Sequence, residues 1–266
     1  MTKSNVNNRR CLLRKLGDKL CEPSSPLFIG LHGYDGKSGR ESLANIPEDY
    51  RGLLLSDYPV KGEDEERDVY LDAYSSTFDR QFSDVEEALR IEGKSDNEIR
   101  IKSLYLWSES PGTGKTTTAS ALLNEYLLRH YIGTLKRGEM PKQRPAYFLD
   151  VNELQTKYNE FNRPKVPDNI AEKAANIYYQ SIEKAKHTEF VVLDDIGIRK
   201  SSEGWRGELH SVINHRTTNR MPTVYTSNVP IEDLAEVFGE KRLADRVRDM
   251  CIEVHFGGES KRGKRR

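Results

Sequence analysis

A glycine-rich stretch near the middle of the chain has the residue types that bind phosphate. It reads Pro111-Gly112-Thr113-Gly114-Lys115-Thr116-Thr117. Glycines let backbone N–H groups curl around phosphate oxygens without obstruction by a Cβ atom. Lys115 offers a positive charge to the β- and γ-phosphates of a nucleotide, and the Thr116 hydroxyl is a candidate Mg²⁺ ligand. The stretch therefore predicts a nucleotide-binding loop of the pattern G-x-x-x-x-G-K-[ST].

One position departs from that pattern, because Glu109 stands where the pattern has glycine. A carboxylate facing a triphosphate would repel it, so we expect the Glu109 side chain to point away. Apolar residues 104–107 before the loop and Ala119–Leu123 after it predict a strand and a helix. This context favours the nucleotide-binding interpretation over a chance match in a surface loop, since the start of the helix would face the phosphates.

Two acidic residues follow a second apolar run farther along the chain. Phe190–Leu193 precede Asp194 and Asp195, and such a run is typical of a fully buried parallel strand. Ligands bind at the carboxyl ends of the strands in open α/β sheets. Asp194 is therefore a candidate Mg²⁺ ligand, and Asp195 is a candidate to orient or deprotonate an attacking water.

The remaining pattern predicts the elements that position these residues. We expect strands at residues 144–151, 222–228 and 251–256, and helices at 69–89, 152–158, 170–186, 205–219 and 231–250. Asn228 ends the fourth strand, where it would position a water beside the γ-phosphate or, alternatively, form a turn. The predicted fold is an α/β domain with a central parallel sheet, and the ten residues after the last strand leave no room for a helical lid.

Composition limits the class of protein. Lys+Arg and Asp+Glu are both 42, so the net charge gives no sign of nucleic-acid binding by the whole molecule, although both termini are basic. No apolar run is long enough for a membrane span, and the N-terminus lacks a signal peptide. Three cysteines make a disulfide framework improbable, and a reducing cytoplasm is expected. Cys11, Cys21 and His32 suggest a zinc site, but their spacing is not the paired C-x-x-C.

Several motifs together resemble the AAA+ ATPases, and more narrowly the DnaC/DnaI type of replicative helicase loader. The matching segments lie within residues 46–262 and are Ile46–Arg51, Pro111–Thr116, Leu193–Gly197, Pro222–Asn228 and Ala244–Val247. The resemblance implies three parts: a small loop-rich module at residues 1–45 that binds the helicase, a linker and helical segment at 46–100, and an AAA+ ATPase domain at 101–266 without a C-terminal lid.

The resemblance also implies roles for individual residues. Lys115 and Thr116 match Walker A, Asp194 and Asp195 match Walker B, Asn228 matches sensor 1, Arg246 matches the arginine finger, and Arg262 is a candidate for sensor 2. Asp195 is one methylene shorter than the glutamate that many AAA+ proteins have, so ATP hydrolysis is expected to be slow or to depend on a partner. For Arg246 the alternative is a helix-end arginine that interacts with the helix dipole.

The implied assembly is a spiral homo-oligomer on the helicase and single-stranded DNA, with ATP between protomers. Residues 152–167 would contact the DNA, since basic residues and aromatics alternate there: Lys157, Tyr158, Phe161, Arg163 and Lys165. Two alternatives stay open at this stage. One is an IstB-like transposition helper ATPase that binds duplex DNA, and the other is a nucleotide-binding adaptor with little hydrolysis, which Glu109 and Asp195 would suit.

Overall fold

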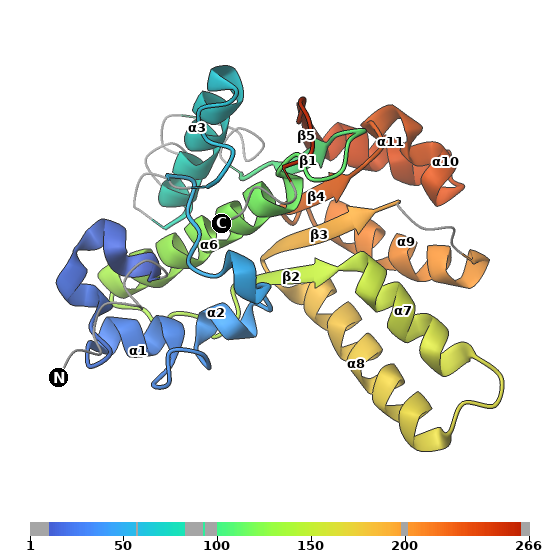
Figure 1. The fold of residues 1–266 in the computed structure, drawn as a ribbon, viewed down its shortest axis with the longest axis horizontal. Helices are drawn as coiled ribbons and strands as arrows, with labels where there is room; N and C mark the ends of the chain where they lie inside the picture. The colour runs from blue at the N-terminus through green and yellow to red at the C-terminus, as the bar shows by residue number, and fades with distance from the viewer. Residues whose placement is uncertain (1–10, 57, 83–92, 94–99, 198–201, 262–266) are drawn as a thin grey trace. The chain divides into compact units, whose positions relative to one another are not determined.

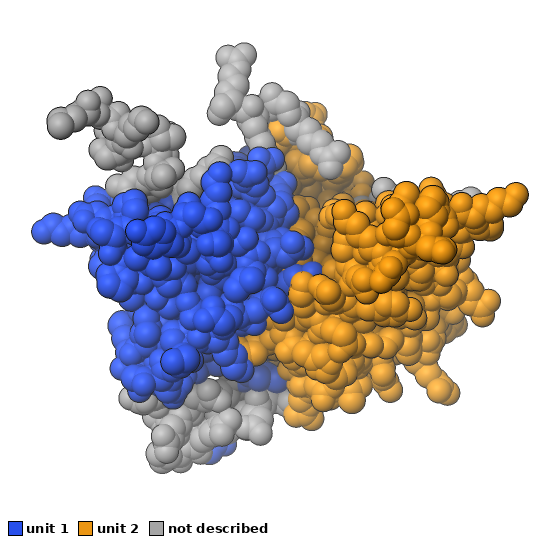
Figure 2. Space-filling model, turned by 90° about the horizontal axis from the view of Figure 1, so that it is seen from below, with its two compact units in different colours: residues 1–101, 120–147 blue, residues 102–119, 148–266 orange. Residues whose placement is uncertain are grey.

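The chain folds into two compact units in the computed structural model. One comprises residues 1–101 and 120–147, and the other comprises residues 102–119 and 148–266, as Figure 2 shows by colour. The structure describes residues 11–56, 58–82, 93, 100–197 and 202–261. The domain limits expected at residues 45 and 100 stay a prediction.

A five-stranded sheet with the order β2-β3-β4-β1-β5 carries the predicted site (Figure 1). Its strands are β1 (Ser103–Trp107), β2 (Ala146–Asp150), β3 (Phe190–Ile196), β4 (Thr223–Ser227) and β5 (Cys251–His255). β1 pairs in parallel with β4 and β5, and β3 pairs in parallel with β4. Parallel neighbours require helical crossovers, so the strand order confirms the predicted α/β fold with a central parallel sheet.

Four helices lie where the sequence predicts helices: α6 (Lys115–Lys136), α7 (Val151–Asn162), α8 (Asp168–His187) and α9 (Glu203–Thr218). Two more, α10 (Leu234–Phe238) and α11 (Lys241–Met250), lie between β4 and β5. Side-chain caps define two of the helix starts: Asp150 accepts a hydrogen bond from the Glu153 N–H at 2.9 Å, and Ser202 accepts one from the Trp205 N–H at 3.3 Å. Each satisfies a backbone donor that a helix start leaves without an intrahelical partner.

The single helix predicted over residues 231–250 is wrong. A 3₁₀ turn at Ile231–Asp233 leads into α10, and Gly239 then separates α10 from α11. Gly239 has a φ of 67°, and a Cβ atom there would lie 2.8 Å from Arg206 Nη1. A glycine tolerates this left-handed conformation without steric cost, which explains why the helix ends there although the apolar spacing continues.

In the unit that contains the N-terminal segment, the described residues up to Tyr50 form short helices. Three 3₁₀ helices lie at Leu12–Leu16, Asp18–Cys21 and Glu48–Tyr50, beside α1 (Pro26–His32) and α2 (Arg40–Leu43). The longer α3 (Glu65–Gln81) and residues 120–136 of α6 belong to the same unit. Buried charges connect these short pieces to residues 120–147 of the same unit. Arg40 donates hydrogen bonds to the carbonyls of Lys142 at 2.9 Å and Pro141 at 3.0 Å, and it lies over the Tyr131 ring.

Candidate nucleotide-binding site

The glycine-rich loop has the backbone shape that phosphate binding requires. Gly112 and Gly114 have φ values of 77° and 104°, which favour glycine over residues with a Cβ atom. The loop leads directly into α6 at Lys115, so the first N–H groups of α6 lack intrahelical partners and face the loop. The other predicted loop residues, Pro111, Thr113 and Thr117, lie in the same loop and in the first turn of α6.

The Lys115 side chain is buried at the mouth of the loop. Its Nζ atom donates to the carbonyl oxygens of Ser108 at 3.4 Å and Ser110 at 3.2 Å. Carbonyl oxygens are weaker hydrogen-bond partners for an ammonium group than phosphate oxygens are. They position the Lys115 ammonium group but do not neutralise its charge. Glu109 is solvent-exposed, as expected for a carboxylate beside a triphosphate site.

Asp194 connects the loop to the centre of the sheet. The Thr116 hydroxyl donates to Asp194 Oδ2 at 3.2 Å, and the Thr226 hydroxyl of β4 donates to Asp194 Oδ1 at 2.7 Å. Burial, followed by the charge of Asp195, raises the pKa of Asp194 to about 7. The two hydrogen bonds lower this pKa but do not outweigh burial. Asp150, at the end of β2, also raises this pKa.

The environment of Asp194 fits a bound divalent cation. Its side chain is buried, and in the part of the chain that the structure describes it has no ion pair. Mg²⁺ prefers oxygen ligands and is commonly held by one or two carboxylates together with substrate phosphates. Asp194 and Thr116 would hold Mg²⁺ between the sheet and the phosphate loop.

Asp195 has a different orientation from its neighbour because the backbone changes direction. Its φ is 61°, and the pairing of β3 with β4 shifts register between Leu193 and Ile196. The Asp195 N–H donates to the Thr226 hydroxyl at 2.8 Å, which fixes the irregular turn. A left-handed conformation outside glycine costs free energy, and residues held in this way cluster at functional sites.

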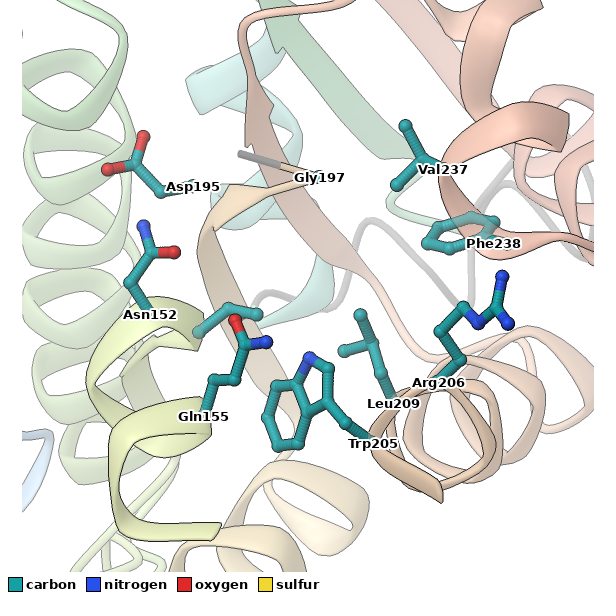
Figure 3. Close-up of a pocket in the computed structure, with 10 residues that line it drawn as sticks. Asn152, Gln155, Asp195, Gly197, Trp205, Arg206, Leu209, Val237 and Phe238 are labelled. Carbon is teal, nitrogen blue, oxygen red and sulfur yellow. The ribbon is translucent and has the colours of Figure 1, made fainter. Parts of the chain in front are cut away.

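Asp195 lines a cavity of about 20 Å³, enough for a water molecule (Figure 3). Asn152 and Gln155 of α7 lie on the same side of the cavity as Asp195 in Figure 3. Trp205 and Leu209 of α9 form another wall, and Arg206, Gly197, Val237, Phe238 and Val151 complete the lining. Polar groups thus lie beside Asp195, and the opposite side has Val237, Phe238 and the charged Arg206.

The other predicted catalytic residues lie at separate points of the same unit. Asn228 follows β4 directly and is partly exposed. Arg246 is on the exposed face of α11, where its Nη1 atom donates to Asn214 Oδ1 of α9. An arginine that acts on a neighbouring protomer is expected to be exposed in this way. Arg262 lies outside the described residues.

The segment expected to contact DNA forms α7 and the loop after it. Its aromatic residues pack on other rings: Tyr158 lies 5.6 Å from both Tyr178 and Trp205, and Phe161 lies 5.4 Å from Tyr178, measured between ring centroids. Lys157 pairs with Glu160 at 3.1 Å. Arg163 and Lys165 are exposed in the loop between α7 and α8.

The candidate zinc ligands have other partners. His32 Nε2 accepts a hydrogen bond from the Leu12 N–H at 3.3 Å, and His32 Nδ1 lies 2.9 Å from Glu41. Burial and the contact with Cys21 raise the pKa of Cys11 to about 12, so this thiol stays protonated. Among the described residues, no group of three or more His, Cys, Asp or Glu side chains could hold a metal ion.

Thr226 is the site residue that sequence reasoning missed. It donates to Asp194 and accepts from the backbone of Asp195, so one hydroxyl sets the position of both acids. A signal was present, because Thr226 is a polar residue in an otherwise buried strand, two residues before Asn228. Side chains two residues apart share a face of a strand, which would have placed Thr226 near the acids.

The fold and this site define a P-loop nucleotide-binding protein with an AAA+-like sheet. Residues 169–266 match the sequence model of a family described as IstB-like ATP binding protein. Replicative helicase loader DnaC of Escherichia coli (strain K12) is 22% identical over 161 residues, which cover 60% of this chain and 56% of DnaC. Replicative helicase loader DnaI of Bacillus subtilis (strain 168) is 28% identical over 183 residues, which cover 64% of this chain and 50% of DnaI.

The chain therefore spans about half the length of the curated relatives it matches. The crystal structures of DnaI and of the DnaC helicase loader are similar in fold, each with a TM-score of 0.52 and coverage of 79% of this chain. Their identities are 19% and 18%, and the matches cover 94% and 100% of those chains. Residues 169–266 are thus similar to IstB-like ATP binding proteins, and the fold is similar to that of DnaI and DnaC. No described helix is long and apolar enough to cross a membrane.

Proposed function

We propose that this protein is an ATP-dependent loader of the replicative DNA helicase onto single-stranded DNA. The hydrogen bond between Thr116 and Asp194 is the main support for the ATPase part of the proposal. It connects the phosphate loop to a buried carboxylate that has no ion pair among the described residues. The loading part is supported by the relatives, DnaC and DnaI, which are named replicative helicase loaders.

Each residue of the site would have a separate role in ATP hydrolysis. Mg²⁺, when bound, would offset the negative charge of the triphosphate. Lys115 would exchange the carbonyls of Ser108 and Ser110 for phosphate oxygens. Asp195 would accept a proton from the attacking water, and Asn228 would orient that water. Hydrolysis is expected to be slow in the isolated chain, because Asp195 is short and faces its own cavity.

Arg246 would complete the site of the neighbouring protomer in a spiral homo-oligomer. Its positive charge would stabilise the transferring phosphoryl group. Arginine fingers increase the rate of hydrolysis by about 10³- to 10⁵-fold. The N-terminal residues 1–45 would bind the helicase, and the exposed Arg163 and Lys165 would contact the DNA backbone. The proposed compartment is the cytoplasm.

A second candidate function is that of a transposition helper that binds duplex DNA. The match of residues 169–266 to IstB-like ATP binding proteins favours it. A third, a nucleotide-binding adaptor with little hydrolysis, is favoured by the left-handed conformation of Asp195. Both keep the same nucleotide site, so the partner and the turnover distinguish them from the loader.

The test combines light scattering after size-exclusion chromatography with a turnover assay. The protein is mixed with its cognate replicative helicase, with and without ATP and single-stranded DNA. A co-eluting complex with ATP turnover supports the loader. ATP-dependent oligomers on duplex DNA without a helicase complex support the transposition helper, and a helicase complex without turnover supports the adaptor.

Lys115→Ala supplies the control for nucleotide dependence. It should abolish ATP binding and ATP-dependent assembly, because no other described side chain of the loop carries a positive charge. Lys136→Ala is the matched variant, since Lys136 is exposed at the opposite end of α6 and should bind ATP normally. Assembly by Lys115→Ala equal to that of the unmodified protein would contradict the proposed role of ATP.

A further inference from the structure

Arg246 makes a contact within its own chain that bears on its proposed action in the neighbouring site. Its Nη1 atom donates to Asn214 Oδ1, and no other hydrogen bond of Arg246 is recorded among the described residues. A guanidinium group is only a donor, so the oxygen of the Asn214 amide must face it. The contact orients one edge of the guanidinium and leaves Nε and Nη2 available for phosphate oxygens.

Asn214 lies on a rigid part of α9. Two residues later, Arg216 is fully buried and binds five oxygen atoms that belong to Ala185, Thr188, Glu189, Pro222 and Thr223, at 2.7–3.0 Å. These bonds join the end of α9 to the end of α8 and the start of β4. The backbone that carries Asn214 is therefore fixed to the sheet.

Arg246 also lies on a well-packed helix. Leu243, Ala244 and Val247 of α11 are buried, and α11 packs against α9. Another exposed arginine of α11, Arg248, pairs with Asp245 of its own helix. Arg246 thus differs from Arg248 in its partner: a neutral amide on another helix instead of a carboxylate on the same one.

The neutrality of the partner decides what the contact can do. A carboxylate would hold the guanidinium more strongly, but it would also cancel much of the charge that a phosphoryl group requires. An amide oxygen fixes the direction and leaves the full positive charge. We propose that Asn214 is a positioning residue that orients Arg246 toward the nucleotide of the neighbouring protomer. This inference rests on the proposed arginine-finger role of Arg246.

The experiment measures ATP turnover in the assembled state for Asn214→Ala and Asn214→Asp, beside Arg246→Ala and Arg248→Ala. Asn214→Ala should lower kcat by about 10- to 100-fold, because misplacement of a catalytic group by ~1 Å costs that order of rate. KM, the thermal midpoint and nucleotide affinity of the unassembled chain should not change. Arg248→Ala, which alters an exposed arginine of the same helix, should keep normal turnover.

Asn214→Asp separates positioning from a purely structural role. It keeps the contact with Arg246, so a structural role predicts normal turnover. Positioning by a neutral group predicts that kcat falls at least as far as in Asn214→Ala while the thermal midpoint is kept or raised. Normal turnover in both Asn214 variants, with Arg246→Ala inactive, would overturn this inference alone. Normal turnover in Arg246→Ala would overturn the arginine-finger role as well.

Discussion

Two of the buried carboxylates, Glu125 in one unit and Asp194 in the other, have opposite surroundings. Glu125 accepts hydrogen bonds from Lys15 at 2.6 Å, from Arg129 and from the Leu55 N–H at 3.2 Å. Asp194 accepts hydrogen bonds from two threonine hydroxyls. Burial alone would raise both pKa values. In Glu125 the Lys15 and Arg129 contacts outweigh burial and lower the pKa, whereas the pKa of Asp194 rises to about 7.

The difference distinguishes a carboxylate that stabilises the fold from one that would bind a cationic ligand. Glu125 has its cations within the chain and connects Lys15, near the N-terminus, to α6. Burial of the Asp194 carboxylate costs free energy, and its two hydrogen bonds do not offset this cost. Such perturbed groups are common at functional sites. Its missing counter-charge is the one that Mg²⁺ would bring.

Glu125→Ala tests the structural half of this comparison and should have the largest effect on stability. Removal of this carboxylate takes the partner from Lys15 and the acceptor from the buried Leu55 N–H, so the free energy of unfolding should fall by about 3 kcal/mol. Urea denaturation measures the loss. The matched control is Asp72→Ala, which removes an exposed pair with Lys61 at 3.5 Å and should change stability by less than ~0.5 kcal/mol. Equal effects of the two variants would contradict the contrast.

Asp194→Asn tests the functional half through pH. The pKa of Asp194 is raised to about 7 in the folded state, so its protonated carboxyl group contributes to the free energy of unfolding. This contribution is fully present below the unfolded-state pKa and is lost as pH rises through about 7. The variant removes this loss. In metal-free and nucleotide-free protein, its stability relative to the unmodified chain should therefore increase by ~2 kcal/mol between pH 5 and pH 8. Thermal unfolding at the two pH values measures this difference.

The pH dependence of stability has the opposite sign for Glu125, whose pKa is lowered. Its contribution to the free energy of unfolding is lost as pH falls through the folded-state pKa. Glu125→Ala should thus destabilise the protein less at pH 3 than at pH 7. A constant difference for Asp194→Asn across pH 5–8 would show that Asp194 has an ordinary pKa, and the comparison would fail.

Thr226→Val should have the smallest effect of the three. It removes the donor to Asp194 and the acceptor for the Asp195 N–H without a large change in volume, so unfolding should become easier by about 1–2 kcal/mol. The pKa of Asp194 should rise further, because a bond to its charged form is lost. Thr226→Ser keeps the hydroxyl and should restore both properties. If Thr226→Ser lowers stability and raises the pKa as Thr226→Val does, the hydroxyl hydrogen bonds do not explain the effect.

The sheet and the phosphate loop could be predicted from the sequence, because each depends on local patterns. Apolar runs that end in polar residues identified four strands, alternation of apolar and polar residues identified β5, and Gly112 with Gly114 identified the loop. The left-handed conformation of Asp195 and the partners of Arg216 could not be predicted, since both depend on tertiary contacts. The break at Gly239 was missed because helical periodicity continues across it.

Nucleotide-induced thermal stabilisation, with and without Mg²⁺, tests the central claim that Asp194 holds the cation of the nucleotide. The unmodified protein and Asp194→Asn are each heated with a slowly hydrolysed ATP analogue in EDTA or in excess Mg²⁺. Mg²⁺ should increase the shift in thermal midpoint for the unmodified protein and leave the shift of Asp194→Asn unchanged. The same Mg²⁺-dependent increase in both proteins would contradict the assignment of Asp194.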